Sequence, residues 1–318
     1  MRICTLIPAY KEKYIKELLQ SLQSQTIKPY RIIFSDDSPG AIFTQRLFSK
    51  EFENLRSGLP IEIISGPRTG AVNNFKNLLH FWNRESELFH LFLDDDVIFP
   101  DFYERHLVAH ISGNFSCSIS RRWESTEDGQ PLTGQPIPEI VANSSSRFVM
   151  LDSDFAFMNT AGECGNWFGE FSNVVLRNYC DELFLHPFMD GISYAGLWDL
   201  GAFLAASMIQ PIVYIQDNLG YFRTGPNQNS AQFFSPIMKA AIIGYIPLNI
   251  IGKRLKKISK DQAINSFKTT SNVINYWYAD QNDIYPLRLA INNLAADTPG
   301  AEDTFLKEWA AFLQSNNF

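Results

Sequence analysis

The first third of the chain alternates short apolar runs with amphipathic stretches, and this pattern limits the fold more than any other feature. The apolar runs that predict strands are 2–7, 31–34, 61–64 and 88–93. The stretches with helical spacing of apolar side chains are 12–25, 41–54, 69–82, with Thr69 as a possible N-cap, and 101–110. Such alternation predicts an α/β fold, with a mainly parallel sheet flanked by helices.

Length and charge narrow the class of protein. With 318 residues, the chain can form one large domain or a domain with an elaboration. The net charge of −7 argues against a nucleic-acid partner, because proteins bind phosphate backbones through basic surfaces. An anionic small ligand would need local positive charge, which a metal ion can supply.

The start of the chain and its cysteines give two further expectations. Met1 is followed at once by a strand-like run, so we expect no secretory signal and a cytoplasmic protein. The scattered cysteines argue against structural zinc and a disulfide framework. We expect small core residues at Cys4, Cys117, Cys164 and Cys180. His106 and His110 are four apart on a predicted helix but lack the H-E-x-x-H pattern, which favours an ordinary helix face.

Chemically active residue types follow each of the four predicted strands. In open α/β sheets, ligands bind outside the carboxyl ends of the strands. A tyrosine there can stack on a nucleobase, an aspartate can accept a base N–H, and an arginine can contact a carbonyl or a phosphate. In chain order, the residues at these ends are Pro8, Ala9 and Tyr10, then Asp36 and Asp37, then Arg68, then Asp94, Asp95 and Asp96.

The run from Asp94 to Asp96 is the most specific of these features. Packed acids repel one another and are rarely buried without partners, so a divalent cation is a simple reason to place them at a strand end. Mg²⁺ typically takes one or two carboxylates and leaves its other positions to water and phosphates. A solvated acidic turn is the alternative, and the residues at the other strand ends favour the metal. No G-x-G-x-x-G and no P-loop supports a different nucleotide site.

Five segments together resemble the family-two inverting glycosyltransferases of GT-A fold, in particular the rhamnosyltransferase-like branch. They are LIPAY at 6–10, QSQT at 23–26, FSDDS at 34–38, GPRTGAVNNF at 66–75 and FLDDD at 92–96. The resemblance implies that a nucleotide-diphosphate sugar lies over the sheet edge and that Mn²⁺ or Mg²⁺ is held on its diphosphate. By this resemblance Asp94 and Asp96 would hold the metal, and Asn73 would join the strand-end residues, including Asp94 and Asp95, around the donor.

This sequence departs from the family pattern at two places. Three acids stand in a row, so which of them holds the metal and which meets the ribose stays open. Lys11 stands where many relatives carry Asn, which would alter contacts near the base or the diphosphate.

The segment 193–204 resembles the one in which this family keeps its catalytic base, at the start of a helix. Leu197 stands where an acid is often found, so the role passes to Asp199, with Asp190 in reserve. The alternative for Asp199 is a helix-start acid stabilised by the helix dipole. The resemblance places Trp198 and Arg223 on the acceptor or phosphate side, and an ordinary exposed side chain is the alternative for Arg223.

The expected domains are a GT-A domain at 1–235, with a donor half at 1–112 and an acceptor half at 113–235, and a helical extension at 236–318. Within the extension, 242–260 joins an apolar stretch to a basic cluster. It is too short to span a bilayer, and a peripheral membrane contact and a core helix are the two interpretations. The core helix is favoured.

The resemblance implies transfer of a sugar from a dTDP-, UDP- or GDP-linked donor to a hydroxyl of a saccharide or lipid-linked acceptor. The expected setting is bacterial surface polysaccharide, such as O-antigen or capsule. Two alternatives remain: a sugar nucleotidyltransferase, which would release pyrophosphate, and a non-catalytic module that binds nucleotide sugars.

Overall fold

Ten strands form one mixed sheet in the described part of the chain, in the order β3-β2-β1-β4-β9-β6-β12-β5, with β7 paired to β6 and β8 to β12. The structure is a computed structural model that describes residues 1–226, 228 and 231–318. The chain forms two compact units. Unit 1 comprises Met1–Met150, Phe168–Leu185 and Ile209–Thr224, and unit 2 comprises Leu151–Trp167, His186–Met208 and Gly225–Phe318. The expected boundary between 1–235 and 236–318 stays a prediction.

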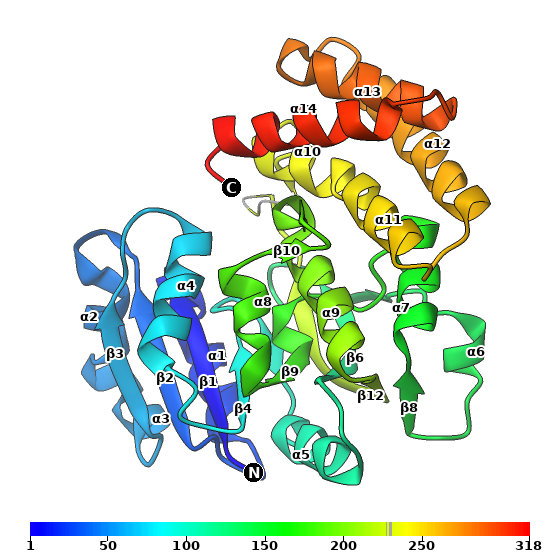
Figure 1. The fold of residues 1–318 in the computed structure, drawn as a ribbon. Coiled ribbons are helices and arrows are strands. Elements are labelled where there is room, and N and C mark those ends of the chain that lie inside the picture. Colours follow the sequence, from blue (N-terminus) through cyan, green and yellow to red (C-terminus); the bar gives the residue numbers. More distant parts are fainter. Residues whose placement is uncertain (227, 229–230) are drawn as a thin grey trace. The chain divides into compact units, whose positions relative to one another are not determined.

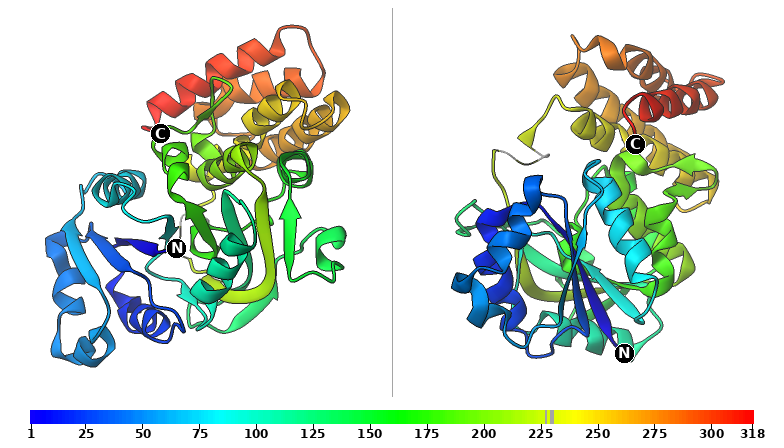
Figure 2. Two further views of the ribbon diagram at one scale, coloured as in Figure 1. Left: turned by 60° about the horizontal axis from the view of Figure 1, so that its bottom comes forward. Right: turned by 90° about the vertical axis from the view of Figure 1, so that its left-hand side faces the viewer.

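The first four strands are parallel, as the sequence predicted (Figure 1). They are β1 (Ile3–Ala9), β2 (Arg31–Asp36), β3 (Ile61–Ser65) and β4 (Leu88–Leu91). The helices between them are α1 (Ile15–Gln23), α2 (Ile42–Leu47), α3 (Glu53–Arg56) and α4 (Ala71–Trp82). The right-hand view of Figure 2 shows helices on both faces of these strands.

Two local predictions in this region were wrong. The helix expected over 41–54 is broken, because Ser49 adopts an extended conformation between α2 and the 3-10 turn Lys50–Phe52. Thr69 is not the N-cap of α4. The cap is Gly70, whose φ of 102° suits a residue without a side chain.

The other half of the sheet is mixed because β9 (Val174–Arg177) lies antiparallel between β4 and β6. The remaining elements of this half are β5 (Val97–Ile98), α5 (Phe102–Ser112), β6 (Cys117–Ser125), β7 (Pro131–Gly134), α6 (Glu139–Ala142), β8 (Phe148–Leu151), α8 (Glu182–Leu185) and β12 (Ile212–Arg223). β6 and β12 are parallel, with two shifts of register between them.

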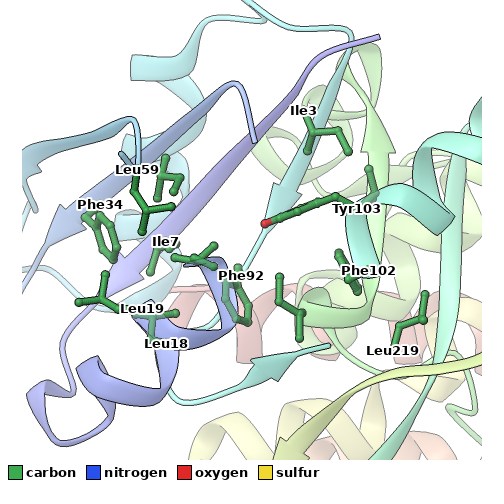
Figure 3. Packing of buried hydrophobic residues seen from close by; sticks show 14 of the residues in the cluster. Ile3, Ile7, Leu18, Leu19, Phe34, Leu59, Phe92, Phe102, Tyr103 and Leu219 are labelled. Carbon is green, nitrogen blue, oxygen red and sulfur yellow. The ribbon is translucent and has the colours of Figure 1, made fainter. Parts of the chain in front are cut away.

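The core of unit 1 explains why these elements form. The apolar face predicted for α1 is fully buried, and Leu18 and Leu19 pack with Phe34 of β2 and Phe92 beyond β4 (Figure 3). Each such side chain stabilises the fold by roughly 1.5–3 kcal/mol through its removal from water. His106 and His110 are buried in ordinary core positions. The expected core role of the cysteines holds for those that are buried, namely Cys4, Cys117 and Cys180.

Unit 2 consists mainly of helices. These are α7 (Ser153–Asn159), α9 (Trp198–Ile209), α10 (Pro236–Ile243), α11 (Tyr245–Arg254), α12 (Lys260–Trp277), α13 (Tyr285–Ala295) and α14 (Ala301–Ser315). The strands β10 (Phe188–Met189) and β11 (Ile192–Ser193) form a small hairpin. Phe305, Trp309 and Phe312 lie on one side of α14 and are buried in this unit.

The segment 242–260 is built as a core segment of unit 2. Ile246, Leu248 and Ile250 are fully buried. Of its basic residues, Lys253 and Arg254 pair with Glu302, so the cluster is partly neutralised within the unit. None of the helices formed by residues 1–226, 228 and 231–318 is both long and apolar enough to cross a membrane.

Candidate functional site

The candidate site begins at the residues that follow β4, beside the end of β1. Asp94 Oδ2 accepts hydrogen bonds from the backbone N–H groups of Tyr10 and Lys11, both at 2.6 Å. These contacts fix the first carboxylate of the run to the residues that directly follow β1. They bring together two of the strand ends that the sequence marked.

The rest of the acidic run is held by Lys11 and by Arg223 at the end of β12. The Lys11 ammonium forms an ion pair with Asp95. The main-chain carbonyl of Asp95 accepts a bond from Arg223 Nε at 2.6 Å, and the backbone N–H of Arg223 donates to Asp96 Oδ1 at 3.2 Å. The run therefore has a defined conformation that β1 and β12 determine.

All three carboxylates are buried, with exposed fractions of 5%, 6% and 1% for Asp94, Asp95 and Asp96. Burial, followed by the charge of Asp95, raises the pKa of Asp94 to about 6. The same two causes raise the pKa of Asp96 to about 8, although Ser172, Arg122 and Arg223 act against them. The run is therefore an electrostatically unfavourable group that an added cation would relieve.

Asp96 also faces two residues that the sequence analysis missed. Asp96, Arg122 and Ser172 line a cavity of about 10 Å³, enough for one water molecule. Within the described residues, Asp96 Oδ2 accepts no hydrogen bond, and Nε and Nη1 of Arg122 donate none. A signal for Arg122 existed: Ser118, Ser120 and Arg122 recur with a period of two on β6, which marks one buried face with polar side chains.

The end of β2 is arranged differently. Asp36 Oδ1 accepts bonds from the backbone N–H and the hydroxyl of Ser38, and Oδ2 accepts both corresponding groups of Thr44. Burial by itself would raise the pKa of Asp36, but these hydrogen bonds hold it below its ordinary value. This carboxylate is committed to closing the loop between β2 and α2.

Asp37 and Arg68 are brought together at the β2 and β3 ends, through the backbone of Arg68. Its N–H donates to Asp37 Oδ1, and its φ of 56° turns the chain at this point. Gly66 is required beneath them, because a Cβ there would lie 2.6 Å from Asp37 Oδ1 and 2.8 Å from its Cα. The Arg68 side chain is exposed, so its guanidinium is accessible to a ligand.

The remaining donor-side candidates lie around the same edge of unit 1. Tyr10 is 58% exposed, which leaves its ring available for stacking. Ala9 is buried and Pro8 half-buried at the end of β1. Asn73 is exposed in the first turn of α4, where its Nδ2 donates to the carbonyl of Thr69 at 3.1 Å.

Arg223 is 3% exposed, so it is not an ordinary surface side chain. Besides Asp95, its guanidinium donates through Nη1 to the carbonyl of Glu127 at 2.7 Å. It also lies over the ring of Tyr14, 4.8 Å from the ring centre. These contacts join the acidic run to the turn between β6 and β7.

The candidates on the acceptor side, Trp198, Asp199 and Asp190, belong to unit 2. Asp199 lies in the first turn of α9, where its Oδ1 accepts the backbone N–H of Leu200 at 2.7 Å. Asp190 has a φ of 50° and lies 3.8 Å from Arg254 in an ion pair. Trp198 begins α9 and is partly exposed. The roles of these three residues stay predictions.

Across the residues that the structure describes, no group of three or more His, Cys, Asp or Glu side chains is arranged to hold a metal ion. The acidic run can still suit a site in which only one or two carboxylates bind the ion and phosphate oxygens and water fill its other positions. The buried, unbonded Asp96 Oδ2 fits such a partial donor set.

A family model described as "Glycosyl transferase family 2" matches residues 4–162 of the chain. No curated protein sequence matches the chain. Among solved structures, TarS residues 1–349 from S. aureus in complex with UDP-GlcNAc is similar at a TM-score of 0.54 and 13% identity, over 99% of this chain and 92% of that chain. A mannosyltransferase, PcManGT from Pyrobaculum calidifontis, in complex with GDP-Man and Mn²⁺ is similar at a TM-score of 0.52 and 10% identity, over 100% and 87%.

Proposed function

The chain belongs to glycosyl transferase family 2, and from that premise we propose that it is an inverting, metal-dependent glycosyltransferase. Its donor would be a nucleotide-diphosphate sugar, linked to dTDP, UDP or GDP. Its acceptor would be a hydroxyl of a saccharide or of a lipid-linked glycan in the synthesis of a bacterial surface polysaccharide. The donor would be held at the strand ends of unit 1.

The observation that carries the proposal is the buried acidic run held against the end of β1 by Asp94. Three packed carboxylates with raised pKa values at two positions are costly to the fold unless a cation joins them. Around them lie an exposed aromatic ring at Tyr10 and an exposed cation at Arg68. This combination suits a base, a diphosphate and the metal ion between them.

Asp94 and Asp96 are the residues that would hold Mn²⁺ or Mg²⁺, and Asp95 would meet the donor. When bound, such an ion stabilises the negative charge on the departing nucleoside diphosphate. The chain's own contribution is to bind and orient the donor through Tyr10, Asp37 and Arg68. Holding donor and acceptor in one complex lowers the entropic part of the barrier.

For the chemical step, we propose that Asp199 is the general base, with Asp190 in reserve. The carboxylate takes the proton of the acceptor hydroxyl, the oxygen attacks the anomeric carbon, and the bond from that carbon to the diphosphate breaks. The attack from the face opposite the leaving group inverts the configuration. Support comes from the place of Asp199 in the first turn of α9, which is the position that the resemblance predicts.

We also propose that the transferred sugar is a deoxyhexose such as rhamnose. This proposal rests on the motif at 66–75 alone.

A lipid-linked acceptor would favour a membrane contact, but the apolar residues of 242–251 are mostly buried in unit 2. The structure thus offers no apolar face there for insertion into lipid, and a saccharide acceptor is the simpler expectation.

Product analysis tests the proposal. The protein is incubated with dTDP-rhamnose, UDP-GlcNAc or GDP-mannose, with Mn²⁺ and a panel of saccharide acceptors. Release of nucleoside diphosphate together with a glycosylated product of inverted configuration is the expected result. Release of pyrophosphate would instead identify a nucleotidyltransferase, and binding without turnover would identify a binding module.

The base is tested by Asp199→Asn with Asp190→Asn as the matched control. The first change should lower turnover by about two to four orders of magnitude while nucleotide and Mn²⁺ binding persist, since only proton removal is lost. The control should retain near-normal turnover. The assignment fails if Asp190→Asn abolishes transfer and Asp199→Asn does not.

A further inference from the structure

Lys11 contacts the acidic run through two different groups. Its backbone N–H donates to Asp94 Oδ2 at 2.6 Å, which fixes the main chain of Lys11 beside the carboxylates. Its ammonium forms an ion pair with Asp95 Oδ2, which places a positive charge on the run itself. The end of β1 therefore supplies both a hydrogen bond and a counter-ion to the acids at the end of β4.

Two arginines near the run also donate hydrogen bonds from their guanidinium groups. Arg223 donates to the main-chain carbonyls of Asp95 and Glu127, and Arg122 Nη2 donates to Glu170 at 3.2 Å. The Lys11 ammonium, by contrast, meets a carboxylate of the run directly. Its charge therefore lies in direct contact with the run and can affect how strongly the run binds another cation.

The Lys11 side chain is 40% exposed, whereas that of Asp95 is 8% exposed. A lysine ammonium is a compact charge on a flexible four-carbon stem, so it can leave Asp95 without any movement of the main chain. The buried carboxylate has no comparable freedom. Because Asp96 Oδ2 is buried and accepts no hydrogen bond from the described residues, the run also retains an oxygen available to a cation.

We propose that Lys11 is a tethered counter-ion whose ammonium opposes the binding of a divalent cation at Asp94 and Asp96. Its ammonium neutralises Asp95 before a nucleotide arrives and releases that carboxylate to the donor when the nucleotide binds together with the cation. The displaced ammonium stays near the run, because the Lys11 backbone is held at Asp94, and it then contacts the diphosphate. This inference rests on the proposed function, since it takes a divalent cation and a nucleoside diphosphate as ligands.

The proposal predicts that one substitution has two effects of opposite sign. Removing the ammonium removes a repelling charge beside the cation site, so a divalent cation should bind more tightly. The same change removes a donor to the diphosphate, so a nucleotide should bind more weakly in the presence of that cation. A residue that merely supports the loop would weaken both affinities or neither.

The test uses the full chain and four proteins: the unchanged protein, Lys11→Gln, Lys11→Arg and the control Lys16→Gln. Lys16 is an exposed lysine of α1, so its replacement changes the net charge equally. Binding of Mn²⁺ alone is measured from the electron paramagnetic resonance signal of the free ion. Lys11→Gln should bind Mn²⁺ about tenfold more tightly, and the other two variants should stay within about twofold of the unchanged protein.

The second measurement is calorimetric titration of UDP and of GDP at saturating Mn²⁺. For the nucleotide that binds, Lys11→Gln should show an affinity about fivefold lower, and Lys11→Arg should restore most of it. Equal Mn²⁺ affinity in Lys11→Gln and the unchanged protein would overturn the inference and leave the proposed function intact. If no variant binds Mn²⁺ with or without nucleotide, the metal dependence in the proposed function fails, and the inference fails with it.

Discussion

The ends of β2 and β4 carry the same residue type in two opposite electrostatic states. Asp36 is surrounded by four hydrogen-bond donors from Ser38 and Thr44, which keep its pKa low. Asp94 and Asp96 are also nearly inaccessible to solvent, and burial first and the charge of Asp95 second raise their pKa values, which their few donors do not offset. Burial alone therefore does not indicate whether a carboxylate serves the fold or a ligand. The balance between donors and like charges around it does.

The largest difference between the ends of β2 and β4 should appear in the activity of Asp94→Asn. The amide can still accept the N–H groups of Tyr10 and Lys11, but it cannot bind a cation with a full charge. We expect kcat/KM for sugar transfer to fall about a hundredfold or more. The urea midpoint should stay equal or rise, because a repelled buried charge is removed.

Asp36→Asn is the matched change at the other end. If Asp94→Asn lowered the urea midpoint as much as Asp36→Asn does, the two ends would not differ in the proposed way.

Asp36→Asn should reduce stability and spare activity. Its amide has one acceptor oxygen, so donors from Ser38 or Thr44 lose a charged partner. We expect a loss of about 2–3 kcal/mol in the free energy of unfolding, measured by urea titration at pH 7.5. Thr44→Val, which removes a single hydroxyl donor, should lose about 1 kcal/mol in the same direction. A drop in Mn²⁺ affinity of the folded Asp36→Asn protein would contradict the comparison.

The sequence predicted that the first four strands run parallel, whereas the role of each residue at their ends stays a prediction. Strand-helix alternation predicts the parallel direction, and this direction brings residues 10, 36, 68 and 94 to one edge of the sheet. The commitment of Asp36 to its own loop depends on the orientation of Ser38 and Thr44, which no spacing rule specifies. The donor-binding role that the sequence suggests for Asp36 stays a prediction.

Arg122 and Ser172 were missed for a different reason. They reach Asp96 from β6 and from the turn before β9, and contacts between segments so distant in the chain leave no periodic pattern that links them. The helix expected over 41–54 failed locally, because hydrophobic spacing continues through Ser49 while the backbone there turns extended. Periodicity reports which face is buried and gives little information about where a helix breaks.

The smallest effect concerns the free energy of unfolding at low pH. It tests whether carboxylates with a full set of hydrogen bonds, such as Asp36, limit stability in acid. The lowered pKa of Asp36 means that its contribution is complete above about pH 4 and is lost only as pH falls further. In β4 and α5, burial lowers the pKa of His90 and of His110 to about 3, and it also lowers the pKa of His106. A neutral histidine in the fold and a protonatable one in the unfolded chain give stability that is complete above about pH 6.5 and declines as pH falls toward the folded pKa.

The histidines should therefore lower the free energy of unfolding below about pH 6.5, well above the range in which Asp36 titrates. Asp94 and Asp96, whose pKa values are raised in the fold, take up protons in the folded state first and offset part of this loss. Each buried histidine contributes up to about 1.4 kcal/mol per pH unit below that point, measured as the pH dependence of the urea-derived free energy of unfolding. Replacing His110 with Gln should reduce the slope of the free energy of unfolding against pH by the equivalent of about one proton taken up on unfolding, because a glutamine cannot bind that proton. His80→Gln, an exposed position of α4, should leave the slope unchanged. An unchanged slope in the His110 variant would show that the buried histidines do not set the acid limit.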